Sequence, residues 1–200
     1  MDSEKGKVLV KLARKSVESC FSGDEKEVEE MLKSYDFLRE ERGVFVTIHT
    51  YPKKKLRGCI GFPLPVYSLG KGVVKAARSA AFEDPRFPPL QENELENVVF
   101  EVSVLTEPEK INYNSCEELL EKIEKYKDGL ILRIGPYSGL FLPQVWKEIS
   151  DKESFLGHLC FKAGIPDPNC WKSKAAEIYK FRVEAFEEKE PNGEVVKSPL

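Results

Sequence analysis

The stretch Leu56-Arg57-Gly58-Cys59-Ile60-Gly61 decides how the rest of the chain is interpreted. It is predicted to be a β-strand, although glycine inside a strand costs conformational entropy and adds no side chain to the packing. Two glycines in one strand indicate a bulge or a close approach to the backbone. Residues two apart share a face of a strand, so Arg57 and Cys59 are expected to project the same way, with an open patch at Gly61. Because a guanidinium beside a thiol favours the thiolate, the stretch predicts a functional site.

The flanking segments predict an α+β fold with largely antiparallel sheet. Strand alternation over 44–49 returns through a polar turn at 52–55, so the 56–61 strand is the second arm of a hairpin. Apolar residues recur at helical spacing over 4–21, and a helix over 68–82 has an alanine-rich face suited to close packing on the sheet. The other predicted elements are strands at 98–106, 129–135, 140–142 and 178–187, a helix from the Ser115 cap to Tyr126, and a helix over 152–163 capped by Asp151.

Composition narrows the class of protein. A chain of 200 residues with 41% hydrophobic residues can form a core without disulfides or metals. The net charge of −3 argues against a protein that mainly grips nucleic acid. No apolar run approaches the roughly 20 residues of a membrane span, and the N-terminal stretch lacks a hydrophobic signal region, so a cytoplasmic location without membrane attachment is expected.

The cysteines and histidines predict neither disulfides nor a metal site. The five cysteines are an odd number, and none forms a Cys-x-x-Cys pair, so free thiols in a reducing compartment are expected. His158, Cys160 and Cys170 are the candidate metal ligands. His158 and Cys160 lie two apart on a predicted helix, about 200° around its axis, so they face different ways. We therefore expect no metal, and the sequence does not identify a cofactor.

Six motifs, in this order, resemble the AMMECR-type domain family, which is named after a human chromosomal region. The likeness runs from about residue 8 to 187 and is greatest to stand-alone archaeal members. The motifs are Leu56–Phe62, Asp84–Pro89, Val102–Thr106, Asp128–Leu130, Ser138–Val145 and Lys162–Gly164.

This resemblance implies one domain over 8–187, built of two unequal α+β subdomains with a cleft between them. The smaller subdomain is expected within 108–145, followed by a C-terminal tail over 188–200. The family's biochemical function is unsettled, although bacterial relatives are linked with a radical-SAM protein and a dioxygenase-like protein. The resemblance also adds Ser138 and Gln144 to the expected binding residues.

Two interpretations of Cys59 remain open. As a nucleophile it needs an activating neighbour, which Arg57 would supply, and a base. His49 would be that base if the hairpin register placed it opposite Cys59. The alternative is a buried thiol that packs as a small hydrophobic group.

The proline-rich loop Asp84-Pro85-Arg86-Phe87-Pro88-Pro89 supplies a second candidate group. Arg57, Asp84 and Arg86 would form a pocket for an anion, since arginine recognises planar anions, or Asp84 would form an internal salt bridge. The preferred function is a cleft that binds a small or peptide-like anionic ligand, admitted at Gly58 and Gly61. The alternative is a non-catalytic module that docks a partner protein or nucleic acid. Whether the protein is an enzyme stays open.

Overall fold

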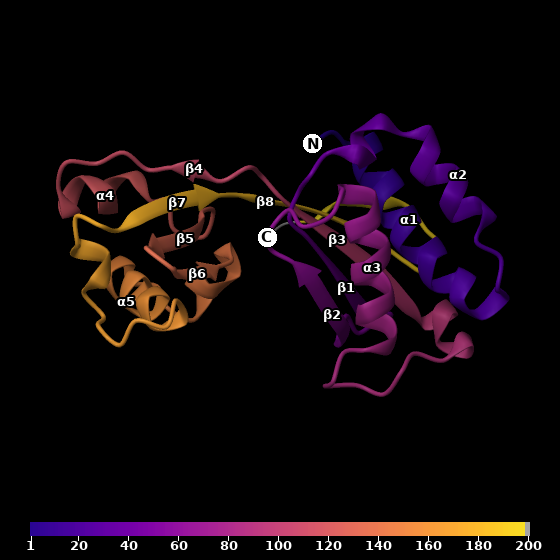
Figure 1. Cartoon of the computed structure of the whole chain (residues 1–200). Helices are drawn as coiled ribbons and strands as arrows, with labels where there is room; N and C mark the ends of the chain where they lie inside the picture. Colours follow the sequence, from indigo (N-terminus) through magenta and orange to yellow (C-terminus); the bar gives the residue numbers. More distant parts are fainter. Residues whose placement is uncertain (199–200) are drawn as a thin grey trace. The chain divides into compact units, whose positions relative to one another are not determined.

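A computed structural model describes residues 1–198 of the chain and divides it into two compact units. Of the described residues, unit 1 comprises 1–105 and 184–198, and unit 2 comprises 106–183. Unit 2 therefore extends well beyond the 108–145 segment expected from the sequence. Pro199 and Leu200, at the end of the predicted tail, lie outside the described residues. The α+β class is confirmed, with antiparallel strands in each unit (Figure 1).

Unit 1 is a five-stranded sheet with the order β2-β1-β3-β8-β9. The strands are β1 (Val44–Thr50), β2 (Leu56–Phe62), β3 (Val98–Leu105), β8 (Val183–Glu188) and β9 (Val195–Ser198). Its helices are α1 (Ser3–Ser22), α2 (Lys26–Ser34) and α3 (Leu69–Phe82), with short 3-10 turns η1 (Asp36–Arg39) and η2 (Glu92–Asn97).

The core of unit 1 lies between one face of this sheet and the helices α1 and α3. Val44, Val46 and Ile48 alternate along β1 and are fully buried in it, as the period of two requires. The alanines of α3 are buried in the same core, so the predicted hairpin and the predicted small-residue helix are both confirmed. On the opposite face, β1 carries Phe45 and Thr47.

Unit 2 is a four-stranded sheet with the order β4-β7-β5-β6. Its strands are β4 (Glu109–Lys110), β5 (Gly129–Ile134), β6 (Tyr137–Phe141) and β7 (Glu177–Phe181). Its helical elements are α4 (Cys116–Lys122), η3 (Pro143–Lys147), α5 (Lys152–Lys162) and η4 (Cys170–Lys172). Ser115 and Asp151 cap α4 and α5 as predicted, and Trp146 stacks on Phe155 in the core with ring centroids 3.7 Å apart.

Three sequence predictions are wrong. The single strand expected over 178–187 is two strands in two sheets, because Arg182 leaves the ladder and its side chain pairs with Asp128 of unit 2. The helix expected to reach Tyr126 ends at Lys122, and Tyr126 itself is in the left-handed region, with φ of 64°.

The third wrong prediction concerns the thiols. Cys160 and Cys170 form a disulfide, which ties α5 to η4 inside unit 2. Cys20, Cys59 and Cys116 are free. The pairing leaves no thiolate at Cys160 or Cys170 for a metal, and no group of three or more His, Cys, Asp or Glu side chains within residues 1–198 has a metal-binding arrangement. None of the helices in that range is both long and apolar enough to cross a membrane.

Candidate functional site

The β1–β2 hairpin sets which side chain faces Cys59. Thr47 lies opposite Cys59, and the register then shifts between Ile48 and His49, so that His49 pairs with Leu56. His49 is therefore not opposite the thiol, and the condition for its role as a base is not met. Thr47 instead donates a hydrogen bond from Oγ1 to Cys59 Sγ, at 3.2 Å.

The two glycines of the motif are required by close packing. A Cβ at Gly58 would lie 2.1 Å from the carbonyl oxygen of Ala80, because α3 crosses β2 at this point. A Cβ at Gly61 would lie 2.3 Å from the ring of Phe45. The open patch expected at Gly61 is therefore filled by Phe45, and neither glycine provides space for a ligand on its own side of the strand.

Asp84 is the polar centre of the site. It is almost fully buried, and its carboxylate accepts hydrogen bonds from the Cys59 amide (2.9 Å) and from Arg86 through the backbone amide, Nε and Nη2 (3.1, 2.9 and 2.7 Å). The Arg86 guanidinium, together with these amide donors, holds the pKa of Asp84 well below its usual range. Arg86 Nη2 also donates to the carbonyl oxygen of Cys59 at 3.2 Å. Asp84 and Arg86 thus satisfy both backbone groups of Cys59 on the edge strand β2.

Arg57 forms a second arginine–carboxylate pair. Its Nε and Nη2 donate to the two carboxylate oxygens of Glu94 at 2.9 and 3.0 Å, which lowers the pKa of Glu94. The side chain of Arg57 is only 10% exposed, and its Nη1 is buried without a hydrogen-bond partner. Phe87 lies next to both guanidinium groups, with its ring centroid 6.0 Å from Arg57 Cζ and 5.6 Å from Arg86 Cζ.

The environment of Cys59 does not activate the thiol. Burial raises the pKa of Cys59, and the hydrogen bond from Thr47 and the charge of Arg86 oppose this shift without cancelling it. The cation that acts on the thiol is Arg86, whereas Arg57, the activating residue expected from the sequence, is engaged with Glu94. A thiol with a raised pKa stays protonated near neutral pH and is a weak nucleophile.

The predicted site residues divide between the two units. Arg57, Gly58, Cys59, Gly61, Asp84 and Arg86 all belong to unit 1, and Ser138 and Gln144 belong to unit 2. Ser138 is an exposed residue of β6 opposite Arg133, and Gln144 is exposed in η3.

Sequence reasoning missed two partners in unit 1, Thr47 and Glu94. The alternation of β1 places Thr47 on the right face, and the two glycines of β2 indicate a bulge, but the sequence does not fix where the bulge lies and so does not decide whether Thr47 or His49 faces Cys59. Glu94 is one of several acidic residues in η2, and nothing in the sequence distinguishes it from its neighbours.

These features define a class of protein: a two-unit α+β protein in which a glycine-containing hairpin carries two arginine–carboxylate pairs beside one aromatic ring. The chain belongs to the AMMECR1 family, whose profile matches residues 10–186.

Protein MJ0810 of Methanocaldococcus jannaschii is 47% identical over 199 residues, which cover 98% of this chain and 96% of that protein. Protein PH0010 of Pyrococcus horikoshii is 47% identical over 201 residues, again 98% and 96% of the two chains. The crystal structure of uncharacterized protein PH0010 matches this fold with a TM-score of 0.79 at 46% identity, covering 100% of this chain and 99% of that one.

Proposed function

We propose that unit 1 binds the anionic group of a small or peptide-like ligand at Arg57 and Arg86, beside Phe87. The observation that supports this function is the buried, unpartnered Nη1 of Arg57. A buried donor without a partner costs about 1–3 kcal/mol, and such groups are rare in native proteins. An anionic oxygen that displaced the groups covering this nitrogen would recover that free energy.

Both arginines are oriented for this role by their own carboxylates. Each guanidinium uses Nε and Nη2 for internal hydrogen bonds, to Glu94 in one case and Asp84 in the other. Nη1 of Arg86, like that of Arg57, makes no hydrogen bond within residues 1–198, and the Arg86 side chain is half exposed. A guanidinium that is already fixed in place loses little entropy when it binds an anion.

Cys59 has a positioning role in this proposal. Its amide and carbonyl groups hold Asp84 and Arg86, while its thiol, with a raised pKa, is unsuited to attack a substrate. The function that we propose is therefore binding, and it requires no covalent step at sulfur.

Nuclear magnetic resonance titration tests the proposal. Inorganic phosphate and N-acetylaspartate, added separately at low ionic strength, are expected to shift the Nε–Hε signals of Arg57 and Arg86 and the amide signal of Cys59. Arg86→Gln should abolish most of these shifts, because only one of the two cations remains. Arg39→Gln is the matched control, since Arg39 is an exposed arginine of unit 1 paired with Asp36. Shifts that are the same in Arg86→Gln and in Arg39→Gln would refute the proposal.

A second candidate function, docking of a partner protein, is favoured by exposed apolar side chains just after β2. Leu64 and Val66 are 48% and 61% exposed. If they contact a protein segment, an N-acetylated Leu-Asp-Leu peptide should bind more tightly than N-acetylaspartate, and Leu64→Ser/Val66→Ser should remove the difference. Equal affinities of the two probes would favour a small ligand.

A further inference from the structure

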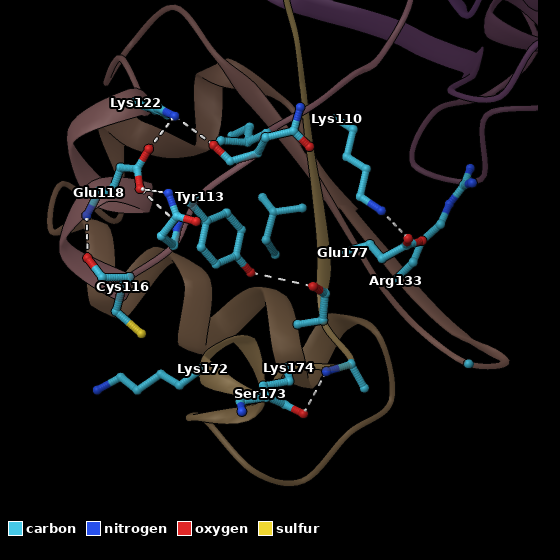
Figure 2. Close-up of a pocket in the computed structure, with 18 residues that line it drawn as sticks. Lys110, Tyr113, Cys116, Glu118, Lys122, Arg133, Lys172, Ser173, Lys174 and Glu177 are labelled. Carbon is cyan, nitrogen blue, oxygen red and sulfur yellow. Dashed lines mark hydrogen bonds and ion pairs between the residues drawn. The ribbon is translucent and has the colours of Figure 1, made fainter.

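Unit 2 has a groove of its own, with a volume of about 1040 Å³. Its walls come from three parts of unit 2: residues 110–118 with Lys122 of α4, Arg133 of β5 with Gly135 of the following turn, and residues 172–178 (Figure 2). The volume lies at the upper end of the roughly 300–1,000 Å³ of small-molecule pockets. None of the sequence motifs discussed above predicted a site here.

The groove carries an excess of positive charge. Five cations line it, Lys110, Lys122, Arg133, Lys172 and Lys174, against two carboxylates, Glu118 and Glu177. Both carboxylates are already paired: Lys122 Nζ donates to Glu118 at 2.6 Å, and Lys110 donates to Glu177. Five cations against two carboxylates leave an excess of three positive charges.

The three remaining cations have no carboxylate partner inside the groove. Arg133 and Lys174 form no ion pair within residues 1–198, and Lys172 reaches only Glu153, outside the groove, at 3.4 Å. Arg133 extends from strand β5, and its guanidinium lies over the ring of Tyr179, with Cζ 5.1 Å from the centroid. Its planar group is therefore held in one orientation before any ligand binds.

The walls of the groove are held by internal contacts. Lys122 Nζ also donates to the carbonyl oxygen of Asn112, at 2.6 Å, and Glu118 accepts from the backbone amide of Asn114. On the other side, the disulfide at Cys170 anchors η4, from which the wall residues Lys172–Ala176 continue. The groove is therefore formed without a ligand.

A phenol lies inside the groove. Figure 2 shows Tyr113 between Lys110 and Lys122 on one side and Ser173 and Lys174 on the other. Tyr113 is half-buried, with its hydroxyl 3.4 Å from the carbonyl oxygen of Ala176, and burial raises its pKa. The phenol therefore stays protonated, and its one O–H donates to the carbonyl oxygen of Ala176.

We propose that this groove binds a small molecule with two or more phosphate groups. Such a molecule carries several negative charges, which suits the net excess of three positive charges among the side chains that line the groove. Arg133 would bind phosphate oxygens through its fork, and Lys172 and Lys174 would act as point charges. A nucleic-acid strand fits less well, because the net charge of the chain is −3 and the cations gather around one groove instead of forming a long stripe.

Isothermal titration calorimetry with the full chain tests the proposal. Tripolyphosphate and ATP, each without divalent cations, serve as probes that share the phosphate chemistry. Equal affinities assign recognition to the phosphates alone, and tighter binding of ATP adds a contribution from the nucleoside. Either result supports the site. Affinity should fall as salt rises from 0.01 to 0.1 M, as the screening length shortens from about 30 to about 10 Å.

Variants separate this site from non-specific charge attraction. Arg133→Gln and Lys174→Gln should each weaken tripolyphosphate binding about tenfold, the value of one charge-assisted hydrogen bond of about 1.4 kcal/mol. Lys147→Gln is the matched control, because Lys147 is an exposed lysine of unit 2 outside the groove and without an ion pair within residues 1–198. Arg86→Gln in unit 1 should also leave this affinity unchanged. Dissociation constants weaker than about 1 mM, or equal losses in Lys147→Gln and Lys174→Gln, would overturn the proposal.

Discussion

The hairpin site of unit 1 and the groove of unit 2 hold their charged side chains in opposite ways. Around β2, Arg57 and Arg86 are each joined to a carboxylate, and only Nη1 of each guanidinium is left without a partner within residues 1–198. In the groove, Arg133 and Lys174 have no carboxylate partner within that range. Buried charges must be paired because desolvation is costly. Exposed charges stay hydrated without a partner and are free to bind a ligand. Unit 1 should therefore lose stability as well as binding when a charged partner is removed, whereas the unit 2 groove should lose binding alone.

The same contrast extends to what holds each unit together. Unit 1 buries the ion pair of Arg14 and Glu188, both almost fully enclosed. Arg14 donates to both oxygens of Glu188 at 2.6 Å and to the carbonyl oxygen of Val98, and Glu188 accepts from the amide of Phe100. Unit 2 relies on the Cys160–Cys170 disulfide.

The largest effect is expected from Glu188→Ala. Removing one member of a buried ion pair costs about 3–5 kcal/mol, since the other charge stays buried without a partner. Both tryptophans lie in unit 2, so hydrogen exchange of the β1 and β3 amides is the measurement that follows unit 1. Glu29→Ala is the control, because it breaks the exposed pair with Lys33, which is worth less than about 1 kcal/mol. Equal exchange rates in the two variants would show that the buried pair stabilises unit 1 no more than the exposed pair does.

The second effect is the loss of the disulfide in unit 2. The double substitution Cys160→Ala/Cys170→Ala should lower the stability of unit 2 by about 2–4 kcal/mol, because it releases a constraint on the unfolded chain. Urea unfolding followed by tryptophan fluorescence measures it, since Trp171 directly follows Cys170. Reductant should shift the wild-type midpoint in the same direction. Cys116→Ala, which removes a free thiol of the same unit, should shift it much less, and an equal shift would argue against the disulfide as the cause.

The sequence predicts the parts of the fold that depend on local pattern. Alternation in 44–49 and the alanine face of 68–82 correctly predict the hairpin and α3, because apolar periodicity follows directly from burial on one side. The strand over 178–187 looks continuous for the same reason, yet it serves two sheets. Its division at Arg182 depends on Asp128, which lies far away in the sequence.

The sequence names candidate site residues but not the side chains that they contact. The motif marks Arg57, Asp84 and Arg86, and charge alone suggests ion pairs among them. Which carboxylate each arginine binds depends on the hairpin bulge and on the position of η2, and both are tertiary features. The Cys160–Cys170 bond was missed because an odd cysteine count and the expected compartment outweighed a separation of 10 residues that permits pairing.

A third and smaller effect concerns the glycines. Gly58→Ala should destabilise unit 1 by about 1–3 kcal/mol, because the new Cβ would lie 2.1 Å from a backbone oxygen of α3, which cannot move aside cheaply. Gly157→Ala in α5 of unit 2 is the comparison, with its nearest neighbour 3.2 Å away. That contact is tight, but alanine has the higher helix propensity, so Gly157→Ala should cost less stability than Gly58→Ala. Hydrogen exchange follows unit 1, and tryptophan fluorescence follows unit 2. If Gly157→Ala lost as much stability as Gly58→Ala, the close contact between β2 and α3 would not explain the effect at Gly58.

The smallest effect is kinetic, and it compares the free thiols of the two units. The pKa of Cys59 is raised above the ordinary value of 9.0 by burial, so the folded protein should hold less of it as thiolate near neutral pH than an ordinary thiol. Iodoacetamide reacts with the thiolate, and burial also restricts its access. We expect Cys59 to be alkylated more slowly than the exposed Cys20 of unit 1 and than the partly buried Cys116 of unit 2. Peptide mass mapping measures the three rates. The alkylation rate of Cys59 should keep rising with pH beyond 9.0.

Thr47→Val should slow the alkylation of Cys59 further, because it removes the hydrogen bond to sulfur. Ser115→Ala, beside Cys116, is the control and should leave the alkylation rate of Cys59 unchanged. If Cys59 were the fastest of the three, the thiol would be activated, and the binding function proposed for unit 1 would have to include chemistry at sulfur.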